Sequence, residues 1–193
     1  TTPKEIIPAV VAGIENWNIA FEEAGFINAV VAKIQPEDAE WDAADYDYNV
    51  VRWSSEPDGN LLGIGPSVSN PLTGEIISAD VVNKLLAIKL GYNYRKLYGY
   101  TEDNDPLMQY ITNLTLHEVG HVLGLRHNFR GSYLYSPDEI HDKNITGNVL
   151  MSSVMDYDPI NIAPEGVEQG IYFSTEPGTV SYTHLTLPTS VPV

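Results

Sequence analysis

The stretch HEVGHVLGLRHNF, residues 117–129, contains three of the five histidines in the chain. His117 and His121 are four residues apart, so on a helix their rings lie on one face, one turn from each other. Gly124 follows, and a glycine adopts the left-handed conformation that ends a helix at little cost. The chain can then turn back and bring His127 to the same point. The spacing therefore predicts a three-histidine cluster at the end of a helix.

Three neutral histidines leave a fourth position open for water, which is the arrangement of catalytic rather than structural zinc. Glu118 lies about 100° round the helix from His117, off the line of the ligands but near a metal-bound water. The alternative is a helix with coincidental surface histidines. The full pattern HExxHxxGxxH has a chance expectation on the order of 10⁻⁵ in such a sequence. We therefore predict Zn²⁺ on His117, His121 and His127, with Glu118 as the catalytic base.

The helix that carries this motif has clear limits. Asp105 is a predicted N-cap, Pro106 fits the first helical position, and Gly124 lies past the last one. Another helix is predicted over residues 7–24. Its apolar stripe consists of Ile7, Val10, Ile14, Trp17 and Phe21.

The rest of the first half reads as a sheet. Predicted strands are a buried strand at 27–35, a second strand at 49–55, an edge strand at 61–69 and a fourth strand at 75–82. Residues 83–100 are ambiguous, with a helix as one reading. Beyond Gly124 the chain is rich in Gly, Pro, Asn and Asp. The prediction is an α+β domain with an upper half to about residue 124 and a loop-rich lower half over 125–178.

Composition restricts the partners. The 193 residues carry a formal net charge of −16, which argues against nucleic acid and against an anionic membrane surface as partners. No run of 18 apolar residues exists, so no membrane span is predicted. The absence of cysteine excludes disulfides and thiolate metal sites. The acidic stretches 42–48 and 101–105 could bind Ca²⁺, but neither has the EF-hand spacing, so solvated loops are favoured. Nothing in the sequence indicates an oligomeric state.

A second motif, SSVMDY at residues 152–157, places Met155 twenty-eight residues after His127. Together with the histidine motif it resembles the Met-turn of the metzincin zinc metallopeptidases. The resemblance implies that Met155 forms an apolar floor beneath the metal without binding it. It also implies that Tyr157, two residues later, reaches the metal or the reacting carbonyl oxygen. The alternative for Tyr157 is a buried aromatic residue that anchors the loop.

The resemblance extends to other segments, covering roughly residues 3–178. GIENWNIAFEEAGF (13–26) and GPSVSNPLTGEI (65–76), together with the two motifs, are similar to a family of large bacterial zinc-dependent metalloproteases. Membership would imply a metzincin-like zincin catalytic domain, with a twisted mixed sheet, a backing helix and an active-site helix below the sheet. It would also imply an extracytoplasmic location: periplasmic, cell-surface or secreted.

The expected activity is that of a zinc endopeptidase, which hydrolyses peptide bonds by a metal-activated water. Glu118 would take the proton of that water, and Tyr157 would help to stabilise the oxyanion. The polypeptide substrate would lie extended along the edge strand at 61–69. One alternative is a zinc-retaining module that binds a peptide or glycan without turnover, although the presence of Glu118 favours an enzyme. Another is a zinc hydrolase of a non-peptide amide, an alternative that the motif leaves open.

The end of the chain departs from the family pattern. VSYTHLTLPTSVPV, residues 180–193, resembles translated sequencing-adapter read-through, and it stands where the family continues into a helical segment. It has neither a helical apolar stripe nor a charged residue apart from His184. We therefore expect residues 1–178 to form the catalytic domain, truncated in its lower half. Residues 179–193 are expected to lie outside the native fold, extended and with few contacts.

Overall fold

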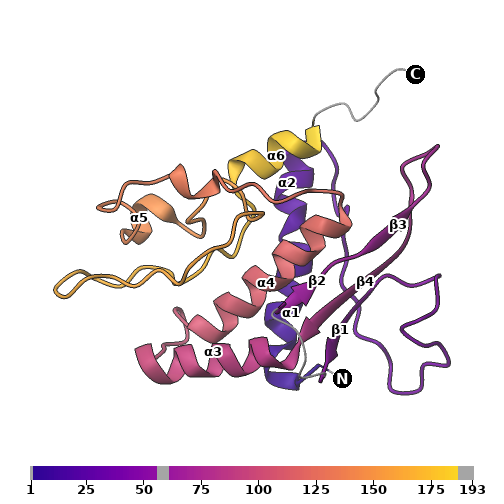
Figure 1. Cartoon of the computed structure of the whole chain (residues 1–193), viewed down its shortest axis with the longest axis horizontal. Coiled ribbons are helices and arrows are strands. Elements are labelled where there is room, and N and C mark those ends of the chain that lie inside the picture. Colours follow the sequence, from indigo (N-terminus) through magenta and orange to yellow (C-terminus); the bar gives the residue numbers. More distant parts are fainter. Residues whose placement is uncertain (1, 56–60, 187–193) are drawn as a thin grey trace.

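The computed structural model describes residues 2–55 and 61–186 (Figure 1). Its sheet is built around β4 (Ile76–Lys84). β1 (Val50–Ser54) pairs with β4 in parallel, whereas β2 (Gly63–Ile64) and β3 (Ser67–Ser69) pair with it antiparallel. The mixed sheet confirms the predicted α+β class and the strands at 49–55 and 75–82. The edge strand predicted at 61–69 is also present, divided into two short pieces.

The longest helix in the described part of the chain is α4. In chain order the helical elements are η1 (Lys4–Ile6), α1 (Ile7–Glu15), α2 (Trp17–Glu23), α3 (Leu85–Tyr98), α4 (Pro106–Val122), η2 (Gly131–Tyr133), α5 (Lys143–Thr146) and α6 (Thr179–Thr186). α4 packs against α1, α3 and β4. Figure 1 shows α4 between the sheet and the loop-rich segment 125–178, in orange and yellow. The ambiguous residues 83–100 are thus mostly helical.

The limits of α4 follow from local chemistry. The carboxylate of Asp105 accepts a hydrogen bond from the backbone N–H of Leu107 at 3.0 Å, and Pro106 occupies the first turn. Such a cap stabilises a helix by about 0.5–2 kcal/mol. At the other end Gly124 has φ +88°, in the left-handed region where a side chain would be strained. The helix therefore begins and ends where the sequence predicts.

Two apolar clusters hold α4 in place. The first joins Leu107 and Ile111 of α4 to α1, to α3 and to Phe173 of the lower half. The second lies further along the helix and packs Leu116 against Trp17 of α2 and Met155 of the lower half. Both clusters contain residues from each side of Gly124. The two halves of the chain therefore pack against each other through both clusters, which fix the lower half relative to the helix.

The strand predicted at 27–35 is wrong. No strand forms there, and Ile27 is 81% exposed and Ile34 68% exposed. The backbone of Val30 instead makes two hydrogen bonds with the side chain of Asn18, at 2.7 and 3.0 Å. Because side chains of the first helices take these backbone groups, the segment follows the helices at the surface and does not join the sheet.

The first helix, predicted to run unbroken over 7–24, is interrupted once. α1 ends at Glu15 and α2 begins at Trp17, with a turn at Asn16. The side-chain amide of Asn16 donates a 2.7 Å hydrogen bond to the carbonyl of Thr175 in the lower half. The interruption thus coincides with a contact between the two halves.

The expectation of an extended tail is wrong for residues 179–186, which form α6. The backbone N–H of Val180 donates to the carbonyl of Ser152 at 2.8 Å, and Ser181 is fully buried. Tyr182 packs against the cluster around Trp17. Residues 187–193 lie outside the described part of the chain. That residues 179–193 are foreign to the native domain stays a prediction.

No described helix combines the length and the apolar character needed to cross a bilayer.

Candidate metal centre

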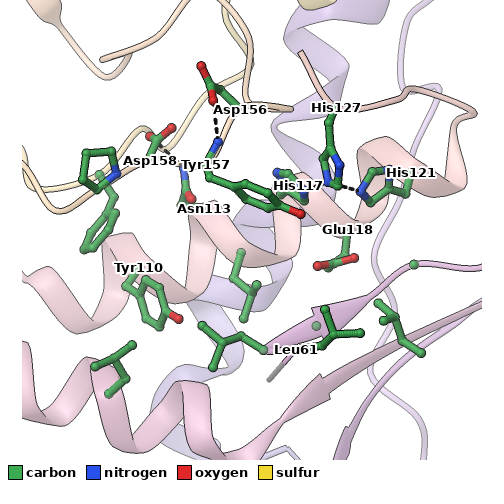
Figure 2. A pocket seen from close by; sticks show the side chains of 18 of the residues that line it. Leu61, Tyr110, Asn113, His117, Glu118, His121, His127, Asp156, Tyr157 and Asp158 are labelled. Carbon is green, nitrogen blue, oxygen red and sulfur yellow. Dashed lines mark hydrogen bonds between the residues drawn. The ribbon is translucent and has the colours of Figure 1, made fainter. Parts of the chain in front are cut away.

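Two elements bring the three histidines together (Figure 2). His117 and His121 project from the last turns of α4, one turn apart. The chain reverses at Gly124, and His127 returns over the end of the helix. One ring nitrogen from each of the three residues lies within 4.8 Å of the others. The cluster predicted from the spacing is therefore present.

The Nε2 atoms form the point of convergence. Nε2 of His127 lies 3.1 Å from Nε2 of His121 and 3.2 Å from Nε2 of His117. Three nitrogens bound to one tetrahedral zinc at about 2.0–2.1 Å would be separated by about 3.3–3.4 Å. The observed spacing therefore fits a zinc ion with little movement of the rings.

Backbone carbonyls set the tautomers of two of these rings. Nδ1 of His117 lies 2.8 Å from the carbonyl oxygen of Val154, and Nδ1 of His121 lies 2.9 Å from that of Leu125. A carbonyl only accepts, so Nδ1 carries the proton in both rings. In the neutral form of each ring, Nε2 then carries no proton and presents its lone pair. Lone pairs facing one another repel, and a shared cation is the ligand that this donor set suits.

Burial keeps the first ligand neutral. It lowers the pKa of His117 to about 4, with a smaller contribution from the neighbouring histidines. The pKa of His127 is also lowered, mainly by desolvation and then by His121. Neutral imidazoles are the form that binds a metal ion. The site is therefore ready to accept one at neutral pH.

Glu118 lies beside this cluster and lines the same cleft. It is only 5% exposed, and burial raises the pKa of its carboxyl to about 7. It is not part of the three-histidine cluster, as its place on the helix predicts. Figure 2 shows its carboxyl on the cleft side of α4, between the histidines and the edge strand. A buried acid with a pKa near neutrality is suited to exchange protons with a substrate.

Met155 packs directly beneath the motif. It is fully buried, and a Cβ added to Gly120 would lie 2.3 Å from its sulfur. Gly120 separates the helix turns of His117 and His121, so the sulfur occupies space that a side chain would need. The carbonyl of Met155 also accepts a 3.0 Å hydrogen bond from the backbone N–H of Asn128, next to the third histidine. Met155 thus lies where the resemblance implied.

Tyr157 is not a buried anchor. Its side chain is 61% exposed, and its ring stacks on His117 with centroids 5.5 Å apart and planes 20° apart. The ring centroid of His127 is 4.6 Å away. Asp156 fixes this loop by accepting hydrogen bonds from the N–H groups of Tyr157 and Ser132. In Figure 2 the hydroxyl of Tyr157 points toward the histidine side of the cleft.

A cleft of about 870 Å³ runs past the histidines. One wall is the edge of the sheet, residues 61–66, and another is the segment after the Met-turn, residues 156–160. Away from the histidines the cleft becomes apolar. Its lining there includes Leu62, Leu90, Tyr94, Tyr110, Leu114, Ile160 and Phe173. The cleft separates the upper and lower halves, as expected for a site that admits an extended ligand.

Sequence reasoning missed three polar residues near the cleft. Asn83 of β4 is fully buried close to Glu118. Tyr110 lines the apolar end and has a buried hydroxyl without a hydrogen-bond partner. Asp158 also lines the cleft, and burial raises its pKa to about 7. The spacing Met155-x-Tyr157-Asp158 could have drawn attention to Asp158. The other two carry no local signal, because only the tertiary fold brings them to the site.

Comparison with known protein families gives a match in the second half of the chain. Searches of curated proteins and of solved structures gave no match. Residues 100–179 match the model of a family described as Met-zincin. The matched segment contains α4, the three histidines and the methionine turn. Over this segment, which is less than half of the 193 residues, the chain is similar to the Met-zincin family.

Proposed function

We propose that this protein is a zinc-dependent endopeptidase. The observation that carries the proposal is the convergence of three Nε2 atoms beside a buried glutamate in an open cleft. Three histidines with room for a fourth ligand are typical of catalytic zinc. The family match supports the same chemistry, and the resemblance to exported bacterial metalloproteases supports an extracytoplasmic location.

Zinc, when bound here, lowers the pKa of a water from about 15.7 to about 7 and polarises a carbonyl group. The chain's own residues handle the protons. Glu118 accepts the proton of the attacking water and returns it to the amine that leaves when the peptide bond breaks. Its burial suits this double role, because a carboxyl with a pKa of about 7 both takes and gives a proton near neutrality.

Tyr157 is placed to assist at the carbonyl oxygen. Its ring is supported by His117 and His127, and its hydroxyl points to the histidine side of the cleft (Figure 2). A hydroxyl there donates a hydrogen bond to the negative charge that develops on the oxygen in the transition state.

The substrate is a polypeptide held along the edge of the sheet. Residues 61–66 line the cleft, and β2 and β3 pair with β4 on their inner side. An extended peptide can add itself to such an edge through main-chain hydrogen bonds. One substrate side chain would then enter the apolar end of the cleft, near Leu114 and Tyr110.

Metal analysis combined with digestion of an internally quenched peptide library tests the proposal. Wild type should hold one zinc per chain and cleave within peptides, and a chelator should stop cleavage. Glu118→Gln should keep zinc but lose about 10²–10⁴-fold in turnover. Glu168→Gln removes an exposed carboxylate far along the chain and serves as the matched control.

Two other results would contradict the proposal. Zinc retention without cleavage of any peptide would indicate a binding module. Cleavage of small amides but not of peptides would indicate a different zinc hydrolase.

A further inference from the structure

A row of three residues crosses the sheet beneath the catalytic glutamate. In the register of the sheet, Asn83 of β4 lies opposite Trp53 of β1 on one side and Gly63 of β2 on the other. Residues opposite one another on paired strands face the same side of a sheet. That side faces α4, since a Cβ added to Gly63 would lie 2.7 Å from Oε1 of Glu118. The row therefore forms the floor under Glu118.

The side chains of Asn83 and Glu118 both approach Gly63. The same added Cβ would lie 2.7 Å from Oδ1 of Asn83, so both side chains border the space that a side chain at position 63 would fill. Asn83 is fully buried. Within the described part of the chain, neither its Oδ1 nor its Nδ2 has a hydrogen-bond partner. An amide in this state is unusual, because each unmatched buried group costs about 1–3 kcal/mol.

Packing alone does not explain this amide. An apolar side chain of similar shape, such as leucine, would fill the position without unmatched polar groups. What the amide adds is a hydrogen-bond donor and an acceptor at the space above Gly63, which the carboxyl group of Glu118 also borders. Nδ2 of an amide can donate a hydrogen bond to a carboxylate oxygen, and Oδ1 can accept one from another donor. Trp53, whose buried Nε1 also lacks a partner, is the neighbour that can hold Oδ1.

We propose that Asn83 is a positioning residue that holds the carboxyl group of Glu118 toward the cleft. The inference rests on the proposed function, because it assigns Asn83 a role through the base of that reaction. Asn83 does not touch the substrate and is absent from the lining of the cleft. Its contribution is to restrict the orientation of Glu118, and a misplaced base loses rate even when substrate binding is unchanged.

The first test does not depend on turnover. In a crystal structure of the zinc-loaded chain, an amide atom of Asn83 should lie within about 2.7–3.2 Å of a carboxyl oxygen of Glu118. In Asn83→Leu the Glu118 side chain should change rotamer or occupy several. A wild-type separation above about 4 Å, or an unchanged Glu118 in the variant, would overturn the proposal. This test also decides the question if the chain cleaves no peptide and the proposed function fails.

The second test measures kcat and KM. Asn83→Leu should lower kcat about 10–100-fold and leave KM and zinc content unchanged, with thermal stability equal or higher. Val81→Ala is the matched control, because Val81 is buried on the same face of β4 two residues away. It should lower stability without changing kcat. If both variants fall equally in stability and in kcat, the role of Asn83 is only structural.

A double-mutant cycle tests whether Asn83 affects activity through Glu118. In the Glu118→Gln background, Asn83→Leu should cost little further activity, because its effect acts through the base. Full additivity of the two losses would contradict a positioning role. Asn83→Asp keeps the shape of the side chain and provides a second variant if Asn83→Leu does not fold. It should lose at least as much kcat, because a second carboxyl beside Glu118 repels it.

Discussion

The carbonyl oxygen of Val154 lies 2.8 Å from Nδ1 of His117, thirty-seven residues earlier in the chain. This contact joins the methionine turn to the first histidine of the motif and fixes the ring that faces the cleft. The next carbonyl, that of Met155, holds the backbone beside His127. One short turn therefore orients two of the three histidines, although none of its own atoms belongs to the cluster.

Met155 should act through packing and ligand geometry. Met155→Ala removes a fully buried side chain that contacts Gly120, and the cavity should lower the free energy of unfolding by about 2–5 kcal/mol. Met155→Leu conserves volume and should cost less than about 1.5 kcal/mol. Urea denaturation measures both. We expect zinc affinity, measured by competition with a chelator, to fall for alanine and to change little for leucine. Equal zinc affinities for the two variants would show that the turn does not orient the histidines.

Zinc should stabilise the fold through His127. At a free zinc concentration 100 times the dissociation constant, linkage predicts about 2.7 kcal/mol of stabilisation. His127→Ala should lose most of this increase in thermal shift, because one of three ligands is missing. Arg126→Ala, an exposed neighbour, should keep it. A zinc-dependent shift in His127→Ala as large as in wild type would remove this residue from the proposed ligand set.

Tyr157 should affect the transition state more than binding. Tyr157→Phe keeps the ring that packs on His117 and His127 but removes the hydroxyl. We expect kcat to fall roughly 10–100-fold with little change in KM, since the hydrogen bond is made only when charge develops on the substrate oxygen. Steady-state kinetics on one library substrate measure the split. An unchanged kcat would leave Tyr157 as a wall of the cleft.

Asp158 should make the protein less stable as the pH rises. Its pKa is raised to about 7 by burial, against 3.8 for the free side chain, so between these values the native state holds a proton that the unfolded state lacks. Stability attributable to this group is therefore greatest below pH 4 and is lost as the pH rises toward 7, at no more than about 1.4 kcal/mol per pH unit.

The variant Asp158→Asn cannot titrate, so its stability should fall less between pH 5 and pH 8. Glu118 also has a raised pKa, but it is present in both proteins and cancels in the comparison. Urea denaturation of the metal-free proteins at several pH values provides the measurement. Parallel pH profiles would show that Asp158 is already ionised at pH 5.

Local chemistry explains which parts could be predicted from the sequence. α4 was predictable because Asp105, Pro106 and Gly124 mark its ends and the histidine spacing marks one face. The course of segment 27–35 was not predictable, because an apolar run of this length fits a buried strand as well as the surface segment that forms. Its course depends on the two hydrogen bonds between the backbone of Val30 and the side chain of Asn18, which could equally have faced solvent.

The supporting residues of the site could not be predicted for a related reason. Asn83 has meaning only beside Gly63 and Glu118, and these three come from two strands and a helix that the fold brings together. The histidines, in contrast, lie within eleven residues of sequence. Candidate ligands that lie close together in the sequence are therefore visible in it, whereas the residues that support them are not.

The close approach of β2 to α4 changes how mutational scanning of this cleft should be interpreted. Gly65 lies so near the helix that an added Cβ would be 2.2 Å from the carbonyl oxygen of Glu118, and Gly63 meets the side chain of the same residue. Alanine scanning detects sites by deleting atoms, and at these positions it adds one. Gly63→Ala and Gly65→Ala would therefore score among the damaging substitutions although neither glycine has a side chain to lose. Along this wall of the cleft, the absence of side chains at Gly63 and Gly65 is what allows the strand to lie against α4.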